Sequence, residues 1–195
     1  MNGRRARVER RTTETTVIVE LHLDGSGQAD VHTGIGFLDH LLTALARHAR
    51  LDLTLRCEGD LHVDDHHSAE DAALALGEAL DRALGERRGI ARFGWALAPL
   101  DEALARVAVD LSGRPFADVN LGLTRDAIGS LSTENVSHVL RSLATAARLT
   151  LHTDVLKGDN DHHRAEAAFK AVALALRQAV AASGFDDVPS TKEAL

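Results

Sequence analysis

Apolar and polar positions alternate in some segments of the chain and follow a helical period in others. Residues 16–23 (TVIVELHL) and 51–57 alternate, which predicts two strands with one buried face each. Between them, residues 36–48 carry apolar side chains at helical spacing, and residues 68–84 are rich in alanine and leucine with acidic residues near their start, so we predict two helices. Residues 24–27 (DGSG) have the composition of a turn.

The rest of the chain shows the same order of patterns. We predict strands near 91–98 and 104–111, with another near 115–121. A helix near 131–147 follows, and a strand over 149–156 and a helix over 162–182 complete the series. The shared unit is β-β-α-β-α, which predicts an α+β fold whose sheets carry helices packed on one face.

An internal repeat accounts for this shared order. Residues 65–80 match residues 161–176 at 9 of 16 positions, and both copies begin with Asp-His-His-x-Ala-Glu. One histidine precedes each copy at a similar distance: His40 lies 26 residues before His66, and His138 lies 24 residues before the second pair. We therefore predict a tandem duplication.

The period of the repeat divides the chain near its middle. The predicted units are a first half-repeat over residues 1–88 and a second over residues 89–185. Residues 186–195 form a loop-like C-terminal tail.

Composition excludes several classes of protein. Of the 195 residues, 45% are hydrophobic and 26% are charged, which is ordinary for a globular chain and unlike a disordered one. The 22 basic and 29 acidic residues leave a net charge of −7, which argues against a nucleic-acid partner. No apolar run reaches the roughly 18 residues of a membrane span. Cys57 is the single cysteine and the N-terminus lacks a secretory signal, so we predict a cytoplasmic protein.

The duplicated histidines predict two metal sites. On a helix, either His66 or His67 can share a face with Glu70, but neighbouring side chains point about 100° apart, so one ion cannot take both histidines. Two ions can each take one. The candidate ligands are His40, His66, His67, Glu70, His138, His162, His163 and Glu166. Divided evenly, they give two sites of three histidines and one glutamate, a donor set that suits Mn, Fe, Ni or Zn.

The acidic residues beside the histidine pairs have two interpretations. Asp64, Asp65 and Asp161 could accept hydrogen bonds from ligand imidazoles, which fixes the tautomer, or they could cap the helices. A single His-His-x-x-Glu segment could itself be only a helix start. Two copies in register, each with a matched upstream histidine, favour metal binding.

Several segments of the chain resemble the imidazoleglycerol-phosphate dehydratases of histidine biosynthesis. The segments are residues 33–40 (TGIGFLDH), 59–67 (GDLHVDDHH) with Glu70 and Asp71, 92–94 (RFG), 110–115 (DLSGRP), 150–152 (TLH), 160–166 (NDHHRAE) and 169–171 (FKA). The likeness extends in order from about residue 10 to residue 192 and leaves no room for a fused phosphatase domain, as in the monofunctional form of the enzyme.

The resemblance implies a reaction and its cofactors. The enzymes remove water from imidazole glycerol phosphate to give imidazole acetol phosphate, through an imidazolate-type intermediate, with two manganese ions in each active site. They assemble as a 24-subunit homo-oligomer with active sites at subunit interfaces. Carried over to this chain, one ion takes His40, His67, Glu70 and His162. The other takes His66, His138, His163 and Glu166. Each ion thus draws on both halves of the chain.

The resemblance also implies acid/base and phosphate residues. Residues 10–15 (RRTTET) match the family's R-x-T-x-E-T segment and give Glu14 the acid/base role. The implied catalytic residues are Glu14, His40, His66, His67, Glu70, His162, His163 and Glu166. The implied substrate contacts are Glu14, His48, Arg92, Arg114, Lys170, Ser190 and Lys192. The family has glycine after this last lysine, where this chain has Glu193.

Two other functions use the same histidines. A non-catalytic metal-binding shell protein would hold its subunits together through metal, but it would have no use for a cationic phosphate site. A dinuclear metal hydrolase would be richer in carboxylates that bridge its ions.

Overall fold

The computed structural model describes residues 3–192, which form an α+β fold. The first half contains β1 (Arg5–Arg11), β2 (Thr15–His22), β3 (Ala29–His32), α1 (Gly36–Ala49), β4 (Asp52–Gly59) and α2 (His66–Leu84). The second half contains β5 (Phe93–Leu100), β6 (Ala103–Asp110), β7 (Phe116–Asn120), the short β8 (Ala127–Ile128) and β9 (Leu131–Ser132), α3 (Thr133–Ala146), β10 (Thr150–Lys157) and α4 (Asp161–Ala179).

The two halves build sheets of the same topology. The first sheet has the order β1-β2-β4-β3 and the second has the order β5-β6-β10-β7. In each sheet three strands are antiparallel, and the last strand, β3 or β7, runs parallel to its neighbour. The repeat seen in the sequence is therefore a repeat of structure.

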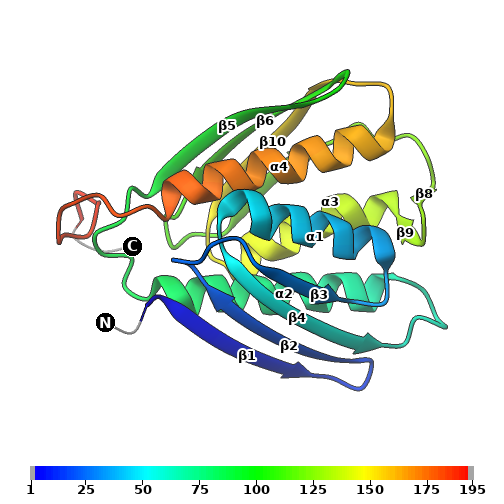
Figure 1. Ribbon diagram of the computed structural model, residues 1–195, viewed down its shortest axis with the longest axis horizontal. Coiled ribbons are helices and arrows are strands. Elements are labelled where there is room, and N and C mark those ends of the chain that lie inside the picture. Colours follow the sequence, from blue (N-terminus) through cyan, green and yellow to red (C-terminus); the bar gives the residue numbers. More distant parts are fainter. Residues whose placement is uncertain (1–2, 193–195) are drawn as a thin grey trace.

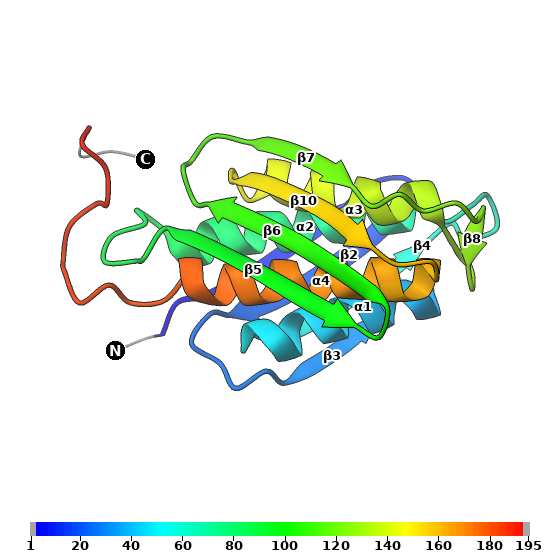
Figure 2. The same cartoon turned by 90° about the horizontal axis from the view of Figure 1, so that it is seen from above.

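The helices lie between the two sheets (Figure 1). Helix α2 packs on β1 and β2, and α4 packs on β5 and β6. Figure 2 shows the second sheet from outside, with the helices behind it. In the middle of the molecule α1 packs against α4 and α2 against α3. Gly77 allows the second of these contacts, because a Cβ there would lie 2.6 Å from the carbonyl oxygen of Leu143.

The buried residues of the core lie at the positions that the alternating and helical patterns of the sequence predict. On β2 the alternate residues Val17, Val19 and Leu21 are buried. On α1 the buried face is formed by residues at helical spacing, among them Leu38 and Leu45. Burial of these faces between the sheets fixes the relative positions of the four helices, and with them the histidines that they carry.

The structure corrects the predicted repeat unit. Each half has three strands of its four-stranded sheet before its first helix, so the unit is β-β-β-α-β-α, to which the second half adds the short β8 and β9. Strand β1 was not predicted because it lies at the edge of the sheet, carries mostly charged residues and buries only Val8. Charged residues on an edge strand protect a sheet from pairing with other chains. Strand β3 was not predicted because it has only four residues, of which only Val31 is buried.

The predicted boundary between residues 88 and 89 falls in the connection between α2 and β5. Among the described residues, none of the helices is both long enough and apolar enough to cross a membrane.

Candidate metal centre and phosphate site

The first cluster of candidate ligands joins the two halves of the chain. His40 on α1 and His162 on α4 both point their Nε2 atoms at Glu166, at 2.9 and 3.2 Å from its Oε2 atom. His162 and Glu166 stand one turn apart on α4, and the packing of α1 against α4 delivers His40 from the other half. One ligand atom from each of the three residues lies within 4.8 Å of the others.

The second cluster has the same composition with the halves exchanged. His66 and Glu70 stand one turn apart on α2, and the packing of α2 against α3 brings His138 to them. The Nε2 atoms of His138 and His66 lie 3.1 and 3.6 Å from the oxygens of Glu70. These ligand atoms also lie within 4.8 Å of one another. Each cluster thus combines residues from both halves.

The glutamates are distributed differently from the expectation carried over by resemblance. Glu166, and not Glu70, lies with His40 and His162, while Glu70 lies with His66 and His138. The reason is helical geometry, since a glutamate shares a face with the histidine four residues before it. The clusters within one chain therefore group the glutamates differently, and the two ligand sets that the resemblance implies stay a prediction, because the ligands of one ion can come from different chains.

His67 and His163 lie outside both clusters, at equivalent positions of the repeat. The Nδ1 atom of His67 lies 3.0 Å from Asp60, and that of His163 lies 2.7 Å from Glu102. When such an imidazole is neutral, the carboxylate holds the proton on Nδ1 and leaves Nε2 free to act as a ligand. The only carboxylates within 4 Å of these Nε2 atoms, among the described residues, are Glu14 and Asp101, at 3.7 and 3.8 Å.

Electrostatics keeps the carboxylates of Glu166 and Glu102 charged, whereas it favours the protonated forms of His67 and His163. Burial opposes ionisation of Glu166, but hydrogen bonds from His40 and Lys170 lower its pKa to about 2, so the carboxylate stays charged. The hydrogen bond from His163 likewise lowers the pKa of Glu102 to about 2. The same kind of bond, to Asp60 and to Glu102, raises the pKa of His67 and of His163.

The donor set fits a divalent metal. Each cluster offers two imidazoles and one carboxylate from rigid helices, and His66 is oriented by a bond of 3.0 Å between its Nδ1 atom and the Asn135 side-chain oxygen. No thiolate lies among the candidate ligands of the described chain, so the donors match the preference of Mn, Fe, Ni or Zn rather than of a thiolate-bound metal.

The three acidic residues beside the histidine pairs make two kinds of contact. Asp64, which precedes the N-cap residue of α2, accepts a hydrogen bond of 2.8 Å from the backbone N–H of His66. Asp65 and Asp161 accept backbone N–H groups of the loop that surrounds β8 and β9, from Ser132 at 2.6 Å and from Thr124 at 2.8 Å. None of the three accepts a hydrogen bond from a described imidazole.

The residues that do orient the imidazoles were missed by sequence reasoning. Asn135 is 69 residues from its histidine and Glu102 is 61 residues from its own, so no local spacing relates them. Asp60, seven residues before His67, lies within one of the segments that carry the family resemblance, and this was the available clue.

The predicted phosphate residues separate into two groups. Arg92 and Arg114 line a hollow of about 630 Å³ with residues 187–192, which include Ser190 and Lys192. Within it, Arg92 is held by Asp110 at 2.7 Å and by the carbonyl oxygen of Pro189 at 2.7 Å. Glu193 and the end of the predicted tail lie outside the described residues.

Lys170 and His48 lie away from this hollow. The ammonium of Lys170 is 2.7 Å from Glu166, so this lysine belongs with the first cluster. Burial, together with the charge of Lys170, lowers the pKa of His48, which therefore favours its neutral form.

The arginine hollow and the first cluster lie at opposite ends of α4. The backbone N–H of Arg92 donates to the carbonyl oxygen of Ala179, at the end of α4, whereas His162 stands in its first turn. At 1.5 Å per residue these positions are about 25 Å apart. In Figure 1 the C-terminal tail accordingly leaves the molecule at the far end of α4 from its start.

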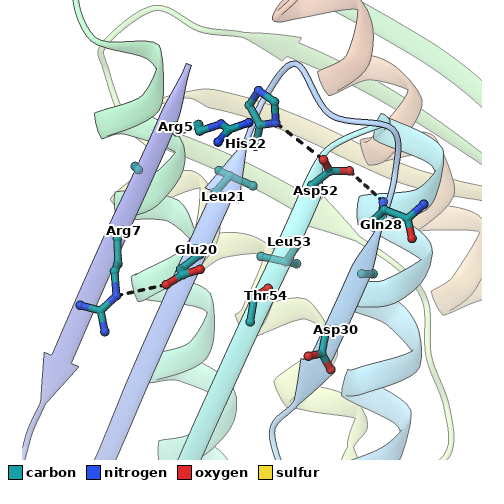
Figure 3. A pocket seen from close by; sticks show the side chains of 12 residues that line it. Arg5, Arg7, Glu20, Leu21, His22, Gln28, Asp30, Asp52, Leu53 and Thr54 are labelled. Atoms are coloured by element: carbon teal, nitrogen blue, oxygen red, sulfur yellow. Dashed lines mark hydrogen bonds and ion pairs between the residues drawn. The ribbon is translucent and has the colours of Figure 1, made fainter. Parts of the chain in front are cut away.

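The outer face of the first sheet carries a separate groove of about 610 Å³ (Figure 3). Its lining includes the ion pairs of Arg7 with Glu20 and of His22 with Asp52. None of the predicted site residues lines it.

Comparisons with known proteins agree on one family. A family model described as imidazoleglycerol-phosphate dehydratase matches residues 33–176. A protein of that name from Candida glabrata is 55% identical over 206 residues, which cover 96% of this chain and 98% of that protein. One from Phytophthora nicotianae is 58% identical over 98% of this chain, which spans 42% of that longer protein.

A solved structure extends the agreement to three dimensions. The crystal structure of imidazoleglycerol-phosphate dehydratase from Staphylococcus aureus superimposes with a TM-score of 0.82 and 35% identity, covering 91% of this chain and 99% of that one. The chain therefore belongs to the imidazoleglycerol-phosphate dehydratase family.

Proposed function

We propose that this protein eliminates water from imidazole glycerol phosphate to give imidazole acetol phosphate, using two manganese ions per active site in an assembly of identical subunits. Family membership makes the chain a hydro-lyase of histidine biosynthesis. The single observation that carries the rest is the pair of equivalent clusters, each with two imidazoles and one carboxylate. A substrate with an imidazole ring at one end and a phosphate at the other suits paired metal sites combined with an arginine hollow.

The two clusters would hold one manganese ion each. His40, His162 and Glu166 would bind the first ion, and His66, His138 and Glu70 the second. When bound, the two cations supply positive charge that stabilises negative charge on the substrate's imidazole ring. The chain's own contribution is to hold these six donors on packed helices, with Glu166 kept anionic by its neighbours.

His67 and His163 would complete the metal sites of neighbouring subunits. Each has its Nδ1 atom bonded to a carboxylate, and neither belongs to a cluster of its own chain. A fourth donor from a neighbour would make binding of metal and assembly of subunits one process. This interpretation supports a homo-oligomer, the 24-subunit shell expected from the resemblance, with its active sites at subunit interfaces.

Glu14 would transfer the protons of the reaction. Its carboxylate is half-exposed and lies 3.7 Å from the Nε2 atom of His67, so it would stand beside the metal to which this histidine binds. From there it can take a proton from the carbon next to the ring or return one to the product.

The arginine hollow would bind the phosphate. Asp110 and Pro189 hold the guanidinium of Arg92, and Arg114 and Lys192 add two further cations. A three-carbon chain between ring and phosphate spans only about 6–8 Å, far less than the length of α4. The hollow of one chain would therefore serve the metals of another.

The alternative functions lack support from the site. A non-catalytic shell protein has no role for the arginine hollow. A dinuclear hydrolase needs carboxylates shared between its ions, and the two clusters of the described chain share none.

Turnover measured directly would test the proposal. The purified protein is incubated with imidazole glycerol phosphate after loading with Mn²⁺, and in parallel after treatment with a chelator. We expect the ketone product only in the loaded sample. A fully loaded protein that forms no product would refute the proposal.

A further inference from the structure

Asp71 is a buried carboxylate for which the proposed reaction has no use. It stands on α2 directly after Glu70 and is only 5% exposed. Its Oδ1 atom accepts a hydrogen bond of 2.9 Å from Nε of Arg10 and forms an ion pair of 2.8 Å with Nη2 of the same guanidinium. Its Oδ2 atom accepts from the hydroxyl of Thr15. These two partners lie on β1 and β2, on either side of the hairpin tip that carries Glu14.

Asp71 is connected to the backbone of Glu14 through the hydroxyl group of Thr12. The hydroxyl of Thr12 lies 3.5 Å from the Oδ2 atom of Asp71, to which it can donate. The same hydroxyl oxygen accepts the backbone N–H groups of Glu14 and Thr15, at 3.1 and 3.0 Å. The tip of the hairpin is therefore folded around one threonine hydroxyl, and the carboxylate anchors both this hydroxyl and the flanking strands.

One turn of α2 presents both Asp71 and the histidine that faces Glu14. His67 lies four residues before Asp71, so the two side chains share a face of the helix. The Nε2 atom of His67 is 3.7 Å from the Glu14 carboxylate, while Asp71 holds the backbone of the same hairpin. The helix thus fixes the position of Glu14 relative to a candidate metal ligand.

The second half of the chain shows that the fold does not require this carboxylate. In the repeat, Ala167 occupies the position of Asp71, and it is fully buried. The equivalent hairpin between β5 and β6 still forms, with a regular antiparallel register down to its tip. At this position of the repeat, a carboxylate is present only in the half whose hairpin carries Glu14.

We propose that Asp71 is a positioning residue for Glu14. It holds the tip of the β1–β2 hairpin against α2, so that the Glu14 carboxylate is kept at a fixed place beside the metal site. The inference rests on the proposed acid/base role of Glu14, and the test is designed to separate the two.

The test is a double-mutant cycle on the manganese-loaded protein. Glu14→Gln, Asp71→Asn and the double variant are assayed for kcat, KM and metal content. We expect Glu14→Gln to lower kcat by about 10²–10⁴-fold. We expect Asp71→Asn to lower it by about 10²-fold through misplacement of Glu14, with KM and metal content unchanged. In the Glu14→Gln background, Asp71→Asn should change kcat by no more than about twofold, because the group that it positions is already gone.

The outcomes distinguish the two ideas. Full turnover of Glu14→Gln would refute the acid/base role itself. If Glu14→Gln is impaired, then full turnover of Asp71→Asn, or losses that multiply in the double variant, would refute the positioning role alone. Asp30→Asn is the matched control, because Asp30 also binds an arginine, Arg56, but lies exposed on the first sheet; its turnover should equal that of the wild type.

A second pair of variants decides the matter if Asp71→Asn does not fold. Thr15→Val keeps the shape of a buried side chain but removes a hydroxyl that donates to Asp71. We expect a lower kcat with unchanged KM and metal content, and recovery of turnover in Thr15→Ser, which keeps the hydroxyl. Wild-type turnover of Thr15→Val would overturn the proposal.

Discussion

The Nε2 atom of His40 and the Oε2 atom of Glu166 lie 2.9 Å apart, although the two residues belong to opposite halves of the duplicated chain. The pairing depends on the contact between α1 and α4, which neither half could make alone. The duplication therefore builds composite sites, and the second cluster shows the same relationship with the halves exchanged.

Removal of one cluster glutamate should remove one of the two ions. We expect Glu166→Ala to bind half the manganese of the wild type, because the first cluster is left with two imidazoles and no anion. Elemental analysis after dialysis measures the stoichiometry. Glu78→Ala, which removes an exposed glutamate paired with Arg82 on α2, is the control and should keep both ions. Wild-type metal content in Glu166→Ala would contradict this assignment.

The carboxylate that orients His67 should tune metal affinity. Asp60→Asn weakens the acceptor for the imidazole N–H, so we expect manganese affinity to fall about 10–100-fold at one of the two sites. Isothermal titration calorimetry with Mn²⁺ measures the affinity of each site. Asp64→Asn serves as the control, since Asp64 accepts the backbone N–H of His66 rather than an imidazole, and an asparagine oxygen can accept the same bond. Equal affinities for the two variants would exclude a role for Asp60.

Removal of the metal by a chelator should dissociate the assembly into smaller particles. If His67 and His163 bind metal held by neighbouring subunits, then EDTA removes a link between chains, and the particle should become smaller. Size-exclusion chromatography with light scattering follows the mass before and after chelation, and again after Mn²⁺ is restored. A mass that does not respond to metal would show that these histidines do not bridge subunits.

The loop before β3 should respond to pH through Asp52. Backbone N–H groups, first that of Gln28 at 3.0 Å and then that of Ser26 at 2.8 Å, lower the pKa of this carboxyl in the folded protein. Because the pKa of Asp52 is lower in the folded protein than in the unfolded chain, its carboxylate stabilises the fold at any pH above its unfolded pKa. This contribution to the free energy of unfolding is lost as the pH falls through the pKa of the folded state.

Asp52→Asn should therefore destabilise the protein at pH 7, and this difference from the wild type should disappear at a pH below the lowered pKa of Asp52. The side chain is 35% exposed, so after solvent screening we expect only about 0.5–1 kcal/mol at pH 7. Urea unfolding in the presence of a chelator at both pH values measures the difference without a contribution from metal release. A difference that is the same at both pH values would exclude the charge of Asp52 as its cause.

The sequence was sufficient for the features that repeat or carry a period. The buried faces of β2 and α1 follow directly from alternation and helical spacing, and the register of the two histidine pairs predicts a double metal site. Strand β1 could not be predicted in this way, because a solvent-exposed edge strand carries charge where a buried strand carries apolar residues.

The grouping of ligands required the packing of the helices. Nothing local in the sequence shows that α1 meets α4 rather than α2, so the contact of His40 with Glu166 within one chain could not be predicted. The same holds for Asn135 and Glu102, whose contacts with histidines span more than 60 residues of chain. Contacts between residues that are distant in the sequence can be predicted from one sequence only where a repeat or a family resemblance relates them.

Complementation between two inactive variants tests most directly whether one active site needs more than one chain. His162→Ala damages a metal cluster and Arg92→Ala damages the phosphate hollow, and each should be inactive alone. Co-expressed with different tags and purified as mixed assemblies, they should recover up to about a quarter of the wild-type turnover, because about a quarter of randomly assembled sites combine an intact cluster with an intact hollow. Mixed assemblies with no more activity than the separate variants would contradict a site shared between chains.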